Sequence, residues 1–260
     1  MTFISTSKSE PGVPERLLTS NRRRRDLWEF SVAYGLIILA VWTPRPWQTY
    51  LSLTALVGVL LVTWHSFEGW RAMGFRVAGF WRSAWVVALA LALAAGAVVL
   101  AARLQTLHAP SSPRIFLERY WSYTIWSFLQ EFMLLNFFLL RFMRLVANRY
   151  LAATAATVLF AVAHLPSPIL TALTLVWGYV ACLVFQRYRN IYIPAIAHAI
   201  FGICIAVTIP GPVDHNMRVG LGYLTYREHV HHHINRQRSQ IDHTVSTVAC
   251  VMAEAPTRRS

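Results

Sequence analysis

Charged residues are scarce in this sequence of 260 residues: they make up 13% of the chain, whereas hydrophobic residues make up 56%. A soluble domain carries about 25% charged residues on average, so the composition excludes an ordinary water-soluble protein. The charge that is present is mainly basic, with 24 Lys and Arg against 11 Asp and Glu. Because the arginines stand at the ends of apolar runs and not along one basic face, they favour membrane topology over nucleic-acid binding.

Cysteine is equally rare. Cys182, Cys204 and Cys250 are an odd number without CxxC spacing, which argues against a disulfide framework and against a thiolate zinc site. A cleavable leader is not expected, because the first apolar run follows the arginines at 22–25 and no small-residue cleavage site comes after it.

Long apolar runs dominate the sequence instead. A membrane helix needs about 20 mostly apolar residues, and an open sheet cannot span lipid. The sequence therefore predicts an all-α fold, a polytopic transmembrane helical bundle of about six to eight membrane helices. Basic clusters that fall on one side of this bundle predict a cytoplasmic N-terminus. The expected spans are roughly residues 27–43, 49–65, 83–103, 121–143, 150–165, 168–186 and 191–209.

Composition divides the chain into four segments. The link at 106–119, with Pro110 and Pro113, separates an N-terminal half without a polar constellation from a C-terminal half that has one. The stretch 217–223, with its glycines and aromatic residues, is a candidate lid over the membrane face. The segments are a basic polar N-terminal extension (1–26), N-terminal membrane helices (27–119), a helical core (120–209) and a polar tail rich in His and Arg (210–260).

Three ionisable residues stand out in the core: Glu131, His164 and His198 are its carboxylate and its two histidines. A single histidine in an apolar helix is more often a hydrogen-bonded packing residue. Three such residues on three helices indicate a site, because ionisable groups at membrane depth are costly. Two imidazoles and a carboxylate can hold a divalent metal, preferably zinc, or activate a water with glutamate as general base.

A second histidine group lies in the tail. Neighbouring histidines point in different directions and only Glu228 is an acid among them, so a solvated tail is a better interpretation than a metal site. The group comprises His215, His229, His231, His232 and His233.

The strings around the core histidines carry a resemblance. Phe160-Ala-Val-Ala-His164 has the form FxxxH, and His198 lies in a helix that follows Pro194. Both strings resemble motifs of the CAAX protease and bacteriocin-processing (CPBP) family of intramembrane metalloproteases, and within it the type II CAAX prenyl endopeptidases. The resemblance covers residues 120–209. It implies that this segment is a helical protease core.

The first motif of that family is degenerate here. The family carries a Glu-Glu pair with an arginine five residues after the first Glu, whereas this chain reads Gln130-Glu131-Phe132. In one register Glu131 takes the catalytic position, Phe132 replaces the second Glu and Asn136 replaces the arginine. In the other, Gln130 takes the catalytic position and Leu135 that of the arginine. The first register is favoured, because it leaves polar side chains at both ends of the motif.

A further departure is Gly202, which stands four residues after His198. Well-studied members of the family carry an asparagine there that holds the site or stabilises an oxyanion. In this chain that role is absent, or it passes to a backbone amide, to Asn136 or to Gln130.

The resemblance implies an intramembrane metal-dependent endopeptidase that cleaves a membrane-associated or lipid-modified peptide. Glu131 would deprotonate a water held by His164 and His198, directly or through a zinc ion with these three residues as ligands. One alternative is a catalytically inactive relative that binds a peptide or partner in the bilayer, since the first motif is degenerate. Another is a bis-histidine haem electron carrier, against which Glu131 argues. Nucleic acid is not an expected partner.

Overall fold

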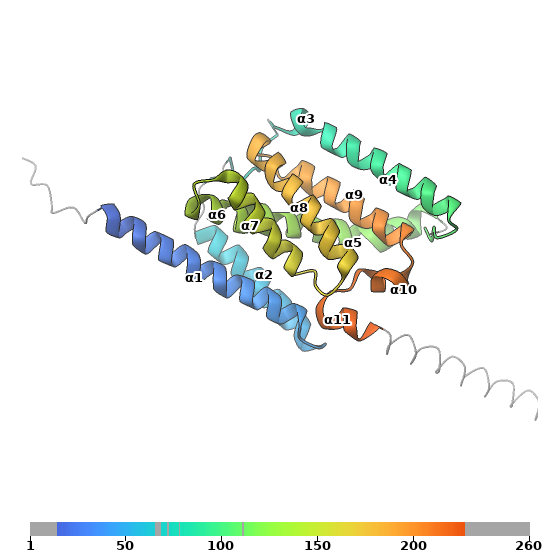
Figure 1. Ribbon diagram of the computed structural model, residues 1–260, viewed down its shortest axis with the longest axis horizontal. Helices are drawn as coiled ribbons and strands as arrows, with labels where there is room; N and C mark the ends of the chain where they lie inside the picture. Colours follow the sequence, from blue (N-terminus) through green and yellow to red (C-terminus); the bar gives the residue numbers. More distant parts are fainter. Residues whose placement is uncertain (1–14, 66–68, 72, 78, 111, 227–260) are drawn as a thin grey trace, which may run out of the picture.

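The computed structural model describes residues 15–65, 69–71, 73–77, 79–110 and 112–226. Every regular element in these residues is helical, in agreement with the predicted all-α fold. Figure 1 shows a bundle in which α1 (Glu15–Val41) and α2 (Trp47–His65) lie together on one side and α4 (Trp85–Arg103) lies on the other. The remaining elements are α3 (Phe80–Ser83), α5 (Pro113–Phe132), the π-helix η1 (Met133–Leu139), α6 (Leu140–Leu145), α7 (Arg149–Val162), α8 (Pro168–Tyr188), α9 (Tyr192–Thr208), α10 (Gly211–Asp214), η2 (His215–Met217) and α11 (Gly220–Leu224).

Two long helices of the core, α5 and α8, begin at local signals in the sequence. Ser112 accepts a hydrogen bond from the backbone N–H of Ile115 at 3.3 Å and caps α5, and Pro113 follows as its first residue. Ser167 likewise accepts a hydrogen bond from the backbone N–H of Leu170 and caps α8, whose first residue is Pro168. A side-chain cap followed by proline is a common helix start, because the cap satisfies a free N–H and proline has none to satisfy.

The number of membrane spans is smaller than the six to eight expected. Within the described residues, four helices are long and apolar enough to cross a membrane, and a fifth if the bent pair of α9 with Gly211–Met217 is one span. The count of six to eight is therefore not confirmed. The helix α7 has only 14 residues, too few for a crossing, and the bent pair turns by 117°. The four are Trp47–His65, Phe80–Arg103, Pro113–Leu145 and Pro168–Tyr188.

The N-terminal helix is tied to the core by ion pairs that the sequence did not indicate. Arg144 of α6 donates to both carboxylate oxygens of Asp26 at 3.1 and 3.2 Å. Arg141, which is only 1% exposed, pairs with Glu29 at 3.2 Å. Arg141 and Arg144 therefore have structural partners in addition to any effect on membrane topology. The helix α1 starts at Glu15, inside the segment 1–26 that was expected to be an aqueous extension.

The Asp26 pair predicts a measurable contribution to stability. Replacing Asp26 with Asn should lower the stability of the folded chain by about 2 kcal/mol, because a nearly buried charge-assisted hydrogen bond is lost. The apparent melting temperature in detergent measures this change. The control is Glu118→Gln, which removes an exposed pair with Arg114 and should change stability by about 0.3 kcal/mol. An equal loss in both variants would contradict the structural role of Asp26.

Candidate active site

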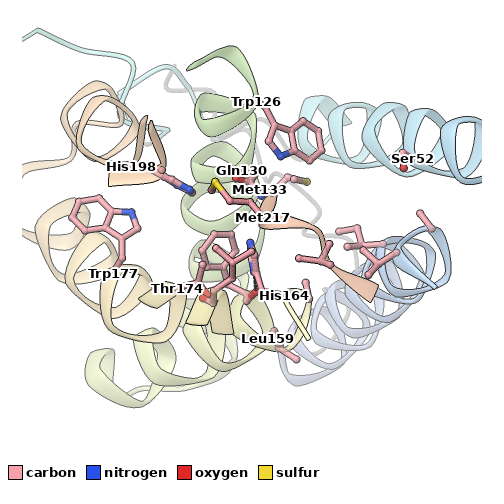
Figure 2. Close-up of a pocket in the computed structure, with 18 of the residues that line it drawn as sticks. Ser52, Trp126, Gln130, Met133, Leu159, His164, Thr174, Trp177, His198 and Met217 are labelled. Atoms are coloured by element: carbon pink, nitrogen blue, oxygen red, sulfur yellow. Dashed lines mark hydrogen bonds between the residues drawn. The ribbon is translucent and has the colours of Figure 1, made fainter. Parts of the chain in front are cut away.

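A cavity of about 290 Å³ lies between the α1–α2 hairpin and the core helices α5, α7, α8 and α9. Its walls are mostly apolar, and His164 and His198 are among the residues that line it. Figure 2 shows the side chain of His198 directed toward the middle of the cavity, where Gln130, Met133 and Met217 gather. The sequence assigned the site to residues 120–209 alone, but Tyr34 of α1 and Ser52 of α2 also line this cavity.

Two of the predicted residues are in direct contact. The Nδ1 of His198 lies 2.9 Å from Oε1 of Glu131. The indole Nε1–H of Trp177 donates to the same oxygen at 2.7 Å. Glu131 is 0% exposed, and a buried carboxylate needs such donors to be stable. The contact joins α5 to α9 and holds the His198 ring in one orientation.

The other histidine is fixed by its own helix end. His164 lies two residues beyond the end of α7, and its Nδ1 is 2.7 Å from the carbonyl oxygen of Phe160. The Phe160 ring lies edge-on to both imidazoles, with ring centroids 4.8 Å from His164 and 6.0 Å from His198. Phe160, the first residue of the predicted FxxxH string, therefore packs between the two histidines.

The acceptors decide which nitrogen of each ring carries the proton. A carbonyl or carboxylate oxygen can only accept, so Nδ1 of each histidine is the donor. Nε2 of each neutral ring is then left as a base that can accept a proton or hold a ligand. A carboxylate behind an imidazole is the arrangement that prepares histidine for general base catalysis.

Gln130 and Glu131 face different ways, as neighbouring residues on a helix must. Gln130 is among the residues that line the cavity, whereas Glu131 is not. The second oxygen of Glu131, Oε2, has no hydrogen-bond partner among the described residues. Glu131 thus contacts His198 on the side away from the cavity. The side chain of this motif that faces the cavity is the amide of Gln130.

Asn136, the expected replacement of the arginine, lies away from the cavity. It is 2% exposed within the π-helix η1, and its amide has no hydrogen-bond partner in the described part of the chain. A π-helix changes the direction of the side chains that follow its start, which sequence spacing does not reveal. Gly202 does line the cavity, and the hydroxyl of Tyr123 lies directly over it.

The donor set does not fit the predicted three-ligand zinc site. Among the described residues, no three His, Cys, Asp or Glu side chains are grouped closely enough to hold a metal ion. The Glu131 oxygen that contacts His198 already accepts two hydrogen bonds, and it lies on the Nδ1 side of the ring. We therefore derive no chemical step through a metal.

The segment after α9 returns over the cavity, close to where a lid was expected. Met217 and Val219 line the cavity, and the backbone N–H of Gly220 donates to the carbonyl of Leu165 at 2.7 Å. Gly220 has φ +55 and leaves no room for a Cβ beside the Val41 carbonyl, so glycine is needed there.

Of the tail histidines, His215 lies in the described part of the chain, and it does not line the cavity. His215 stacks on Tyr223 with ring centroids 3.9 Å apart, and its Nδ1 lies 2.9 Å from the carbonyl of the same residue. His229, His231, His232 and His233 lie outside the described residues.

Trp177 and Tyr123 are the site residues that sequence reasoning missed. Tryptophan in a membrane protein is usually read as part of the interfacial belt. Trp177, however, stands in the middle of α8, far from either end of that span. A tryptophan at mid-span, where its N–H needs a partner, was the available signal.

Comparison with known proteins bears on the same segment. Residues 112–204 match the family model described as Rce1-like, type II CAAX prenyl endopeptidase. No curated protein matches the chain, and no solved structure does. The match and the apolar helices together indicate an integral membrane protein. Since the matched segment contains Glu131, His164 and His198, the resemblance of this part of the chain to the type II CAAX prenyl endopeptidases is confirmed.

Proposed function

We propose that the protein is an intramembrane endopeptidase that cleaves a membrane-associated, lipid-modified peptide. The observation that carries the proposal is the Glu131–His198 contact at the wall of an apolar cavity that also holds His164. The match to prenyl endopeptidases over residues 112–204 supports a prenylated peptide as the substrate class. A largely apolar cavity with a few polar groups suits such a ligand.

The geometry supports a mechanism in which His198 contacts the water. Nε2 of His198 accepts a proton from the water as its oxygen attacks the peptide carbonyl carbon. Glu131, bonded to Nδ1 at 2.9 Å, stabilises the imidazolium that forms. His198 then returns the proton to the leaving nitrogen as the C–N bond breaks. Nε2 of His164 accepts a hydrogen bond from the same water and aligns it.

This assignment differs from the prediction that Glu131 itself deprotonates the water. Glu131 does not line the cavity, so we assign it the role of a positioning residue that acts through His198. A zinc ion bound to His164 and His198 stays a prediction of the resemblance. We also infer a cytoplasmic N-terminus, because the arginines at 22–25 lie in the N-terminal part of α1, before its apolar part.

The alternative is a protein that binds the peptide without cleaving it. The side chain facing the cavity at the first motif is the amide of Gln130, not an acid. An amide cannot act as a general base at neutral pH, which favours this alternative if His198 proves inactive.

Hydrolysis in proteoliposomes tests the proposal. The probe is a farnesylated peptide with its modified cysteine in fourth place from the carboxyl end. We expect cleavage by the wild type, and a loss of about 10⁴-fold in the double variant His164→Ala, His198→Ala. The control is His108→Ala, because this exposed histidine does not line the cavity and its ring contacts the Thr106 carbonyl at 2.9 Å. Binding of the probe without cleavage by the wild type would favour the alternative.

The wild type and the His164, His198 double variant also test whether the site holds zinc. Metal content is measured after His229, His231, His232 and His233 are replaced by Ala in both, so that this histidine group cannot bind metal. Near-stoichiometric zinc that disappears in the double variant would support a metal centre. Cleavage by a zinc-free wild type would support the glutamate and histidine pair alone.

A further inference from the structure

Tyr123 of α5 packs against Gly202 of α9 at the wall of the cavity. Its phenol lies so close to Gly202 that a Cβ at this position would overlap the hydroxyl and the adjoining ring carbons. Both residues line the cavity. Any larger residue at 202 would push the phenol out of this place, so the glycine and the tyrosine form one structural unit.

This unit is one helical turn from the candidate base. Gly202 follows His198 by four residues on α9, and residues with that spacing share a face of the helix. The Tyr123 hydroxyl is therefore on the cavity wall that also presents His198. A water activated by His198 would lie in the same part of the cavity as the phenol O–H.

Amide hydrolysis places a negative charge on the carbonyl oxygen, which needs a hydrogen-bond donor that is already in position. Several other hydrogen-bond donors that line the cavity already donate to acceptors of the protein itself. Trp177 donates to Glu131 at 2.7 Å, Thr174 to the Leu170 carbonyl at 2.7 Å, and Tyr34 to the Leu159 carbonyl at 3.0 Å. Figure 2 shows Ser52 on α2, well removed from His198.

We propose that the Tyr123 hydroxyl donates the hydrogen bond that stabilises the oxyanion, and that Gly202 is the residue that makes room for it. The inference rests on the proposed endopeptidase function. In a largely apolar cavity such a bond is stronger than in water. The phenol keeps its proton throughout, and the bond lengthens again as the tetrahedral intermediate collapses to the carboxylic acid product.

The test compares Tyr123→Phe, Gly202→Ala and the double variant, with the farnesylated probe. We expect each single change to lower kcat by about 100-fold with little change in KM, because the bond forms in the transition state. The double variant should lose no more than either single one, because the two residues act as a unit. The inhibition constant of a phosphinate peptide, which carries the tetrahedral oxyanion, should rise in parallel with the loss of kcat.

The control is Tyr50→Phe, because this tyrosine is exposed on α2 and does not line the cavity. An unchanged kcat in Tyr123→Phe, beside an active wild type, overturns the role of Tyr123 and leaves the endopeptidase function standing. Additive losses in the double variant also overturn it, since the phenol would then not depend on Gly202. A wild type that does not cleave the probe overturns both proposals.

Discussion

Replacing Glu131 with glutamine should reduce peptide hydrolysis by about 10³- to 10⁴-fold, with the protein still folded. Glutamine can still accept a hydrogen bond from Nδ1 of His198, but it cannot stabilise the imidazolium that forms when His198 takes a proton. Loss of the carboxylate behind a catalytic histidine costs about 10⁴-fold in the serine protease triad. The measurement is kcat for the farnesylated probe in proteoliposomes, together with the melting temperature.

The matched control is Glu118→Gln. Glu118 lies on the same helix α5, but it is exposed and pairs with Arg114 at 2.8 Å, so its loss should leave kcat unchanged. Full activity in Glu131→Gln would contradict this mechanism, because His198 would then not need the carboxylate.

Replacing Gln130 with glutamate should have the opposite effect, an increase of about 100-fold in kcat. Gln130 faces the cavity beside His198, so a carboxylate there would contact the attacking water directly. Proton transfer to a positioned base contributes about 10² to 10⁴ in rate. Only the ionised carboxylate can take the proton, so the gain should increase as the pH rises.

The control for this gain is Gln48→Glu, which adds a carboxylate to the α2 wall of the same cavity. It should give no increase, because it lies on the opposite side from His198. A folded Gln130→Glu variant with no gain, in a chain whose Glu131→Gln variant is inactive, would mean that the side chain at 130 does not meet the attacking water. That result would favour the first of the two registers.

The three ionisable residues of the core could be found from the sequence, because charge in an apolar helix is costly enough to be rare. The starts of α5 and α8 could also be predicted, since Ser-Pro pairs at 112–113 and 167–168 are local signals. Three of the expected spans, 49–65, 83–103 and 168–186, agree with candidate membrane helices of the structure to within a few residues.

The direction of individual side chains could not be predicted. Gln130 and Glu131 are neighbours, and only the packing of α5 against α9 decides which of them meets the cavity. The π-helix that follows turns Asn136 away, although spacing alone suggested a polar partner for the site. The ion pairs of Asp26 and Glu29 join residues more than 100 positions apart, and no local pattern encodes such a pairing.

The cavity has two walls of different origin. Its reactive side comes from the helices inside residues 112–204, which match the prenyl endopeptidases, whereas the facing side comes from the α1–α2 hairpin, outside that match. Substitutions at Ile37, Ala55 or Leu56 would reshape the space offered to a ligand without touching the contact between Glu131 and His198. The residues of the proposed chemistry and the residues that shape the facing wall of the cavity thus belong to separate parts of the chain. Substitutions in one part can occur while the residues of the other part stay the same.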